Sequence, residues 1–340
     1  MKISKRIIAF IFLVIVIVFS LTIYKLPYYV YQPGGVNALT DVVSVDGGYK
    51  SEGEIHLVTV SGGQPTIIEY LIASVRSFHE IVPLEQVRPD DMSQEDYLHY
   101  QLKLMEGSQH SSVVVAYEAA GKEVNFIDNG IYVMGVIKGM PAENIVKTGD
   151  RFLTVDDQAI KNSKDLISYV EQLEEGEKIK VEIERDGSTI TEEIPVAQFP
   201  DDEDKIGIGI RLVNDTEVSV SPEIFFDSGK IGGPSAGLMF ALEMYDQLTE
   251  EDLTKGYLIA GTGEIGEDGE VHRIGGIDKK VVAADKAGID IFFAPNEQGK
   301  IDSNYEEAKI TAEKINTDME IIPVDYFTDA LEYLEGLSHK

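Results

Sequence analysis

The chain has 340 residues, no cysteine, and 60 acidic against 29 basic side chains, which gives a formal net charge of −31 at pH 7. This length is sufficient for about two domains, each with its own core. The acidic balance argues against nucleic-acid binding, which requires clustered Lys and Arg. The lack of cysteine excludes disulfides, thiolate zinc sites and a cysteine nucleophile.

Residues 7–24 form an apolar run without a charge, IIAFIFLVIVIVFSLTIY. As a helix this run would span about 27 Å, close to the hydrocarbon thickness of a bilayer. Lys2, Lys5 and Arg6 precede it, so the positive-inside rule places residues 1–6 in the cytoplasm and the rest of the chain outside. A cleaved signal peptide is the alternative, but the run is long for one and no small-residue cleavage site follows. We therefore expect a transmembrane helix that anchors an extracellular body in the cell membrane.

The first block, residues 45–124, mixes strand and helix patterns. GEIHLVTV, from Gly53, has the character of a strand, and GGQPTIIEYLIASV continues it as a turn and a helix. Residues 105–119, MEGSQHSSVVVAYEA, have the periodicity of a further helix. The block therefore predicts a mixed fold.

The second block, residues 125–199, is rich in strand patterns. Two apolar strands flank GD and DD turns, and Ser163 is expected to be the N-cap of the helix that follows. An alternating hairpin turns at Asp186-Gly187. The acidic run PDDEDK, residues 200–205, is expected to be a linker.

This second block resembles a PDZ domain of the bacterial protease type. The resemblance rests on Gly130, Ile131, Tyr132 and Val133 and on the following GVIKGMPAENIVKTGDRFLTVDDQAI. It implies that these four residues form the loop that binds a peptide carboxylate, and that the peptide adds as a strand beside the Ser163 helix. A small β-rich domain without a ligand is the alternative.

The third block, residues 206–340, alternates strands and helices, which is typical of an α/β or α+β domain. Its GGPSAG motif precedes an apolar helix expected over Leu238–Leu248. Pro234 at the first helical position would place Ser235 at the helix N-terminus. A hydroxyl there is approachable, and the free N–H groups can stabilise an oxyanion.

Two kinds of base could activate Ser235. The motif fits the G-x-S-x-G elbow of Ser-His-Asp hydrolases, but His272 lies in a predicted hairpin, His339 lies near the chain end, and no strand leads directly into the serine. Lys280 is predicted to lie on the apolar face of the next helix, with Lys279 nearer the outside. Burial would lower the pKa of Lys280 and leave a neutral amine that can deprotonate the serine. A snorkelling surface lysine is the alternative.

GGPSAG, GTGEIGEDGEVHRIGGIDKK and AGIDIFFAP together closely resemble the proteolytic domain of the Lon family, whose members are peptidases with a serine–lysine dyad. The resemblance begins at Ile231 and implies that Ser235 is the nucleophile and Lys280 the base. One position departs from the pattern, because Gly232 stands where Lon proteases usually have Asp.

The same resemblance implies four supporting residues. Thr262 would orient the lysine amine, and Glu264 would support the site. Gly233 and Pro234 belong to the nucleophile motif.

The order of anchor, PDZ domain and peptidase looks like the anchored Lon-like PDZ proteases of Gram-positive bacteria. It implies an α+β fold in which the PDZ domain is inserted into a Lon-type peptidase domain that begins within residues 45–124. The chain has no P-loop motif and no metal-site motif, so neither ATP nor a cofactor is expected. We predict an ATP-independent serine endopeptidase for peptide or unfolded protein substrates. The alternatives are a non-catalytic PDZ scaffold on a peptidase fold and a Ser-His-Asp hydrolase.

Overall fold

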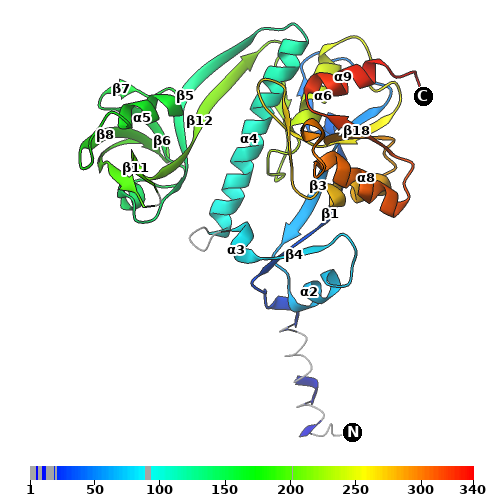
Figure 1. Cartoon of the computed structure of the whole chain (residues 1–340), viewed down its shortest axis with the longest axis horizontal. Helices are drawn as coiled ribbons and strands as arrows, with labels where there is room; N and C mark the ends of the chain where they lie inside the picture. Colours follow the sequence, from blue (N-terminus) through cyan, green and yellow to red (C-terminus); the bar gives the residue numbers. More distant parts are fainter. Residues whose placement is uncertain (1–4, 7–9, 13–18, 20, 89–92, 201) are drawn as a thin grey trace. The chain divides into compact units, whose positions relative to one another are not determined.

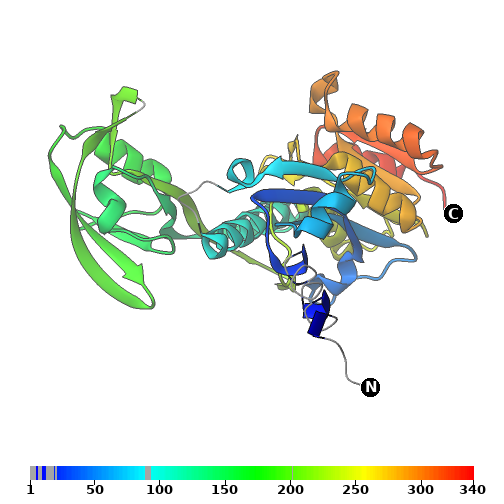
Figure 2. The ribbon, with the colours of Figure 1, turned by 90° about the horizontal axis from the view of Figure 1, so that it is seen from below.

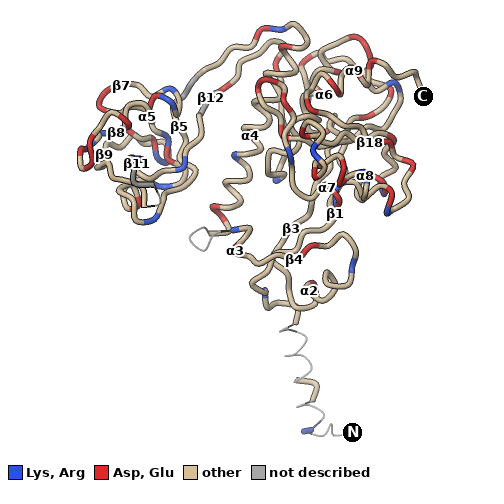
Figure 3. The backbone as a smooth tube through the Cα atoms, in the orientation of Figure 1, with Lys and Arg blue, Asp and Glu red and all other residues tan. Residues whose placement is uncertain are grey.

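The computed structural model describes residues 5–6, 10–12, 19, 21–88, 93–200 and 202–340. Two units divide the chain (Figure 1). Unit 1 contains Met1–Lys122 and Pro222–Lys340, and unit 2 contains Glu123–Ser221. Unit 2 is therefore inserted into the chain of unit 1. Asp and Glu (red in Figure 3) are spread over both units, in line with the 60 acidic and 29 basic side chains of the sequence.

Within the described residues, the strands, α-helices and 3₁₀-helices (η) of unit 1 are β1 (Tyr28–Ala38), η1 (Leu39–Asp41), β2 (Val43–Val45), β3 (Glu54–Gly63), α2 (Ile67–Ala73), β4 (Glu80–Pro83), α3 (Leu84–Val87), α4 (Gln94–Ala119), β13 (Ile224–Phe226), α6 (Gly237–Leu248), β14 (Leu258–Gly261), β15 (Glu264–Ile265), β16 (Val271–His272), α7 (Ile277–Lys286), β17 (Ile291–Pro295), η3 (Glu297–Gly299), α8 (Asn304–Ile315), β18 (Glu320–Val324) and α9 (Phe327–Glu335).

Those of unit 2 are β5 (Val124–Val136), η2 (Pro141–Asn144), β6 (Arg151–Val155), β7 (Gln158–Ala159), α5 (Ser163–Val170), β8 (Lys178–Arg185), β9 (Ser188–Pro195), β10 (Ala197–Phe199), β11 (Asp202–Gly207) and β12 (Ile210–Val220).

Unit 1 is built on a mixed sheet with the strand order β18-β17-β14-β3-β1-β4. The strands from β18 to β3 are parallel, and β1 and β4 are antiparallel to their neighbours. Helices α7 and α8 cover one face (Figure 2), and α6 and α9 cover the other. Successive residues of β17 show the two faces, because Phe292 joins the core with Val281 of α7 whereas Phe293 packs against Tyr333 of α9. The sheet is therefore buried on both faces, and its strands come from both segments of the chain.

Unit 2 is built on a sheet with the order β12-β5-β6-β8-β9, and β7 pairs with β6. The predicted hairpin turn is confirmed, since β8 and β9 are joined by Asp186 and Gly187, with φ of 50° and 72°. These positive values suit the tight turn of a two-residue hairpin. The predicted helix is also present, but it begins at Ser163, and Asn162 rather than Ser163 is its N-cap.

The prediction of a linker at residues 200–205 is wrong for most of these residues. Residues 202–207 form β11, which pairs with β10, and β12 continues unit 2 as far as Val220. Backbone pairing with β5 along β12 decides this boundary, which a local acidic pattern does not reveal. The insert therefore extends beyond the predicted 125–199, and unit 1 resumes at Pro222 rather than at residue 206.

No helix in the described part of the chain has both the length and the apolar character of a membrane span. The predicted transmembrane segment, residues 7–24, lies largely outside the described residues.

A buried ion pair ties β8 to the turn before β6 in unit 2. The Arg185 guanidinium donates to both carboxylate oxygens of Asp150, at 2.7 and 2.6 Å, and to the Ile145 carbonyl at 2.9 Å. Asp150 is 1% exposed, and the Lys147 N–H also donates to its carboxylate at 2.8 Å, so Arg185 is the cationic partner of a buried carboxylate.

We expect Arg185→Ala to lower the free energy of unfolding of unit 2 by about 3–5 kcal/mol, because it leaves a buried carboxylate unpaired. Hydrogen exchange of the β6 and β8 amides in the full chain would measure this loss. Lys178→Ala is the control, since the Lys178–Glu193 pair is exposed, and its removal should cost under about 1 kcal/mol. Equal effects of the two changes would contradict the assignment.

Candidate active site

Ser235 lies in unit 1, in the loop between β13 and α6. The helix begins at Gly237 with Ala236 as its N-cap, so Pro234 is not at the first helical position as expected. Gly233 has a φ of +88°, a left-handed conformation that turns the backbone two residues before Ser235. Ser235 therefore precedes the helix instead of starting it, and its hydroxyl lines a cavity.

Helix α4 supports this loop from the other segment of unit 1. The Gly233 N–H donates to the Gln101 carbonyl at 2.8 Å, and the Ser108 hydroxyl donates to the Pro234 carbonyl at 2.7 Å. A Cβ at Gly232 would lie 2.8 Å from the Cβ of Gln101, which is too close. The departure at Gly232 therefore has a steric reason, because α4 occupies the space that a side chain would need.

The sequence reasoning missed the role of α4 in the site. Ser108 and Ser112 are both buried, and the Ser112 hydroxyl lies 2.8 Å from the Gly237 carbonyl at the start of α6. The available signal was a pair of serines one turn apart beside an apolar run, since buried hydroxyls need partners.

Lys280 reaches Ser235 from α7, which begins after Gly276. The Lys280 Nζ donates to the Ser235 Oγ at 2.7 Å and to the Thr262 Oγ1 at 2.8 Å. The Thr262 hydroxyl donates in turn to the Ser235 carbonyl at 2.8 Å. Thr262 follows β14, and its N–H donates to the Phe293 carbonyl at 3.1 Å. The structure thus brings Ser235, Lys280 and Thr262 together from three separate elements.

Burial dominates the electrostatics of Lys280. Its side chain is almost inaccessible, and desolvation lowers its pKa from 10.5 to about 7. Its amine is hydrogen-bonded to the hydroxyls of Ser235 and Thr262 rather than to carboxylates. Near neutral pH a substantial fraction of this amine is therefore unprotonated.

Lys279 differs from the prediction, because it is buried and does not face outward. Its Nζ lies 2.8 Å from Glu80 of β4 and 3.1 Å from Asp278. Burial lowers the pKa of Lys279, but the bonds to these two carboxylates raise it by more, so that it lies above its ordinary value. The two neighbouring lysines are both buried, and their partners determine which one carries a charge.

The dyad opens into a cavity of about 540 Å³ within unit 1. Strand β3, helix α4 and the loop before Ser235 line it. The pairing of β14 with β3 ends at Leu57, and Val58, Thr59 and Val60 beyond that point line the cavity. A stretch of strand edge therefore lies beside the dyad.

Gly233 and Pro234 line the same cavity as Ser235, whereas Glu264 and the two candidate histidines are not at the dyad. Glu264 of β15 and His272 of β16 are backbone partners in an antiparallel pair of strands, and His272 is exposed. His339 lies 3.7 Å from Glu52. In the described residues neither histidine contacts Ser235, so the geometry does not build a Ser-His-Asp site.

The predicted carboxylate-binding loop of unit 2 is wrong. Gly130 through Val133 lie inside β5, where Ile131 pairs with Phe152 of β6 on one side and with Asn214 of β12 on the other. A strand paired on both sides cannot accept a peptide as an additional strand. The sheet order leaves β12 and β9 at the edges, and β12 lies beside α5, where the Ser163 N–H donates to the Asn214 Oδ1 at 2.7 Å.

Comparisons with protein families match two parts of the chain. Residues 220–335 match the family described as Lon protease (S16) C-terminal proteolytic domain. Residues 106–196 match the family described as PDZ domain. The first match contains Ser235, Thr262 and Lys280.

Curated relatives give the same picture. A Lon protease of Campylobacter jejuni is 33% identical over 144 residues, which is 39% of this chain and 17% of that protein. A Lon protease of Campylobacter concisus is 39% identical over 102 residues, 29% of this chain and 12% of that protein. The chain thus spans less than a fifth of the length of these relatives.

Among solved structures, the PDZ domain of an SdrC-like protein from Listeria monocytogenes is 28% identical and covers 25% of this chain and 88% of its own, with a TM-score of 0.23. The proteolytic-domain match and the Lon relatives support a serine-type peptidase.

The two lysines should affect stability with opposite dependence on pH. The folded pKa of Lys280 lies below its unfolded value, so the unfolded chain binds more protons between about pH 7 and 10.5. We expect wild type to gain stability relative to Lys280→Met as pH rises through this window. Lys279 has a raised pKa, so its contribution is present below its unfolded pKa and is lost as pH rises through the folded one.

Thermal unfolding of wild type, Lys280→Met and Lys279→Met between pH 6 and 11 measures both slopes. Lys279→Met is the matched control, because it changes a buried lysine on the same helix. Parallel curves for the two variants would contradict the assigned protonation states.

Proposed function

We propose that the chain is an ATP-independent serine endopeptidase in which Ser235 is the nucleophile and Lys280 is the general base. The 2.7 Å hydrogen bond between the Lys280 Nζ and the Ser235 Oγ carries this proposal, because the amine is buried and bonded to hydroxyls. The sequence contains no P-loop that could bind ATP.

The chemistry follows from the proton positions. The neutral Lys280 amine takes the Ser235 proton while Oγ attacks the scissile carbonyl carbon. The ammonium that forms gives its proton to the leaving amine, which breaks the peptide bond and leaves an acyl-enzyme. Water then attacks the ester carbonyl while Lys280 takes a proton from it. The bond between the acyl carbon and Oγ breaks, the carboxylic acid leaves, and Lys280 returns the proton to Oγ, which restores Ser235 and the neutral amine. Thr262 holds the amine in line, since its Oγ1 accepts from Nζ throughout.

The chain offers backbone donors for the developing oxyanion. In the described part of the chain, neither the Ser235 N–H nor the Ala236 N–H donates to a backbone carbonyl. Both lie at the N-terminal end of α6, where the helix dipole favours negative charge.

The proposed substrate is an extended peptide or an unfolded protein segment. The edge of β3 from Val58 to Val60 can pair with such a segment beside Ser235, as a strand added to the sheet. A folded domain would not fit a cavity of about 540 Å³. In unit 2 the β12 edge beside α5 is the proposed recruitment surface, in place of residues 130–133.

We further propose that residues 7–24 anchor the chain in the cell membrane with the catalytic body outside. The charge-free apolar run and the preceding basic residues support this proposal.

Active-site substitutions test the dyad. In a short fluorogenic peptide assay without nucleotide, we expect Ser235→Ala and Lys280→Arg to lower kcat/KM by about 10²–10⁴-fold or more, because one lacks the nucleophile and the other cannot deprotonate. Lys279→Arg is the control and should stay near wild type, since it preserves the charge beside Glu80. An active Lys280→Arg enzyme would refute the assignment of the base.

The rate should rise with pH through the titration of Lys280. Its pKa of about 7 means that the amine is protonated and inactive below pH 7 and neutral and active above it. A profile of kcat/KM from pH 5 to 10 should therefore show a midpoint near 7. A midpoint near 10 would show that the base is an ordinary exposed lysine.

Removal of unit 2 separates recruitment from chemistry. Val124 and Val220 are antiparallel partners, so their Cα atoms lie about 5 Å apart and the gap can be closed. We expect deletion of residues 125–219, which joins Val124 to Val220, to preserve cleavage of the short peptide and to reduce cleavage of an unfolded protein. Circular dichroism checks the fold. If the deletion variant cleaved both the short peptide and the unfolded protein at wild-type rates, recruitment by unit 2 would be excluded.

A further inference from the structure

Helix α2 presents an apolar stripe to solvent. Ile68, Leu71, Ile72 and Val75 are 38%, 59%, 42% and 83% exposed. Their spacing of i, i+3, i+4 and i+7 places them on one side of α2 and of the turn that continues it. Amphipathic helices of globular proteins normally turn such a stripe to the core.

The core side of α2 is formed by other residues. Ala73 is buried, and the Tyr70 ring packs 5.1 Å from the Tyr28 ring of β1. The stripe is therefore a second apolar surface, additional to the one that packs α2 onto unit 1.

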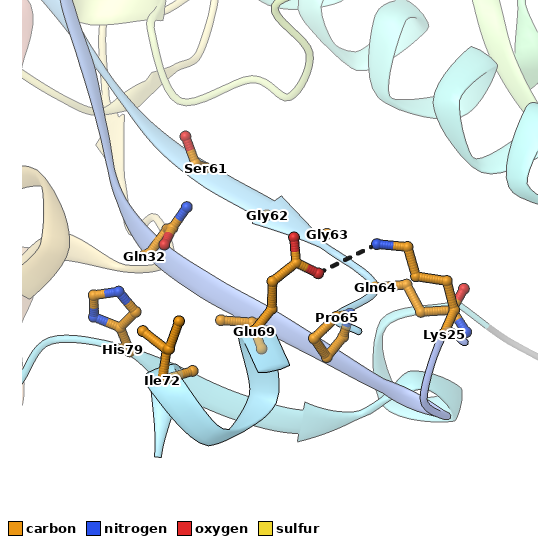
Figure 4. A pocket seen from close by; sticks show the side chains of 12 residues that line it. Lys25, Gln32, Ser61, Gly62, Gly63, Gln64, Pro65, Glu69, Ile72 and His79 are labelled. Carbon is orange, nitrogen blue, oxygen red and sulfur yellow. Dashed lines mark hydrogen bonds and ion pairs between the residues drawn. The ribbon is translucent and has the colours of Figure 1, made fainter. Parts of the chain in front are cut away.

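The end of the apolar N-terminal run is fixed to the start of α2. The Leu26 N–H donates to the Pro65 carbonyl at 2.9 Å, and Lys25 forms a β-bridge with Thr66, the N-cap of α2. The Lys25 Nζ lies 3.3 Å from Glu69 of α2, and Figure 4 shows this ion pair. The run of residues 7–24 thus ends directly beside this helix.

We propose that the apolar stripe of α2 lies in the lipid interface of the membrane that residues 7–24 span. This inference rests on the proposed membrane anchor. Continuity with that segment selects lipid as the occupant, because Lys25 follows the run and is bonded to α2. Tyr24 at the end of the run is 61% exposed, and tyrosine favours the interface between lipid and water. Apolar burial, rather than attraction to headgroups, holds the stripe in place, as expected for a chain with a net charge of −31.

The stripe would hold the catalytic cavity close to the membrane. Strand β3 leads from Val60, which lines the cavity, towards Pro65, which is bonded to Leu26. Five residues of extended chain span about 17 Å. The enzyme would therefore cut polypeptide close to the bilayer surface, which favours segments that emerge from the membrane.

Single nitroxide labels on the full chain test the stripe, since the chain has no native cysteine. Leu71→Cys and Val75→Cys report on the stripe, and Phe12→Cys reports on the anchor. Ile310→Cys on α8 is the matched control, an exposed apolar residue on another helix of unit 1. Each labelled protein is reconstituted in phosphatidylcholine vesicles, and its collision rates with oxygen and with a water-soluble nickel chelate are measured.

We expect the oxygen-to-nickel ratio at Leu71 and Val75 to be several-fold higher than at Ile310. A ratio equal to that of Ile310, with a lipid signal at Phe12, overturns the stripe inference and leaves the anchor intact. An aqueous signal at Phe12 overturns both, whereas the dyad is tested separately by the peptide assay. Spin–spin broadening at Leu71 that disappears on dilution with unlabelled chain, without a raised ratio, assigns the stripe to a second copy and also overturns the inference.

Discussion

The hydrogen bond between Lys280 and Ser235 can activate the serine only if the amine is neutral, which requires that water is excluded from it. Several elements of unit 1 contribute to this exclusion. Water or a nearby carboxylate would keep Lys280 protonated, and the 2.7 Å contact would then join an ammonium to an unactivated hydroxyl. The core between α7 and the sheet excludes water, and Thr262 supplies a neutral partner. Only under these conditions does burial hold the pKa of Lys280 near 7.

Lys279 shows how specific this arrangement is. It lies one residue away on the same helix and is equally buried, but Glu80 and Asp278 keep it charged. A neutral amine therefore requires both burial and the absence of a carboxylate partner. Glu80 comes from β4, so the N-terminal segment of unit 1 supplies the charge that stabilises the first turn of α7.

The loop that contains Ser235 likewise depends on contacts between the two chain segments of unit 1. Gln101 and Ser108 of α4 bind the backbone on either side of Gly233 and Pro234. Strand β3 pairs with β14 as far as Leu57 and then continues past the dyad paired only with β1. The N-terminal segment thus completes the cavity, and unit 2 is inserted after α4 without interrupting the sheet.

The sequence by itself determined the motifs and the local elements. GGPSAG and IGGIDKK, through their resemblance to the Lon family, pointed to Ser235 and Lys280 as the proposed nucleophile and base. Asp186-Gly187 predicted a hairpin, because a tight turn depends on residues close together in the chain. Tertiary structure decided the rest. Residues 130–133 became the interior of β5, and most of the acidic run at 200–205 became part of β11, because strand pairing overrides a local pattern. The protonation of two adjacent lysines was likewise decided by tertiary structure. Glu80 adds a carboxylate to Lys279, whereas Ser235 and Thr262 offer Lys280 only hydroxyls, and all three lie far from α7 in the chain.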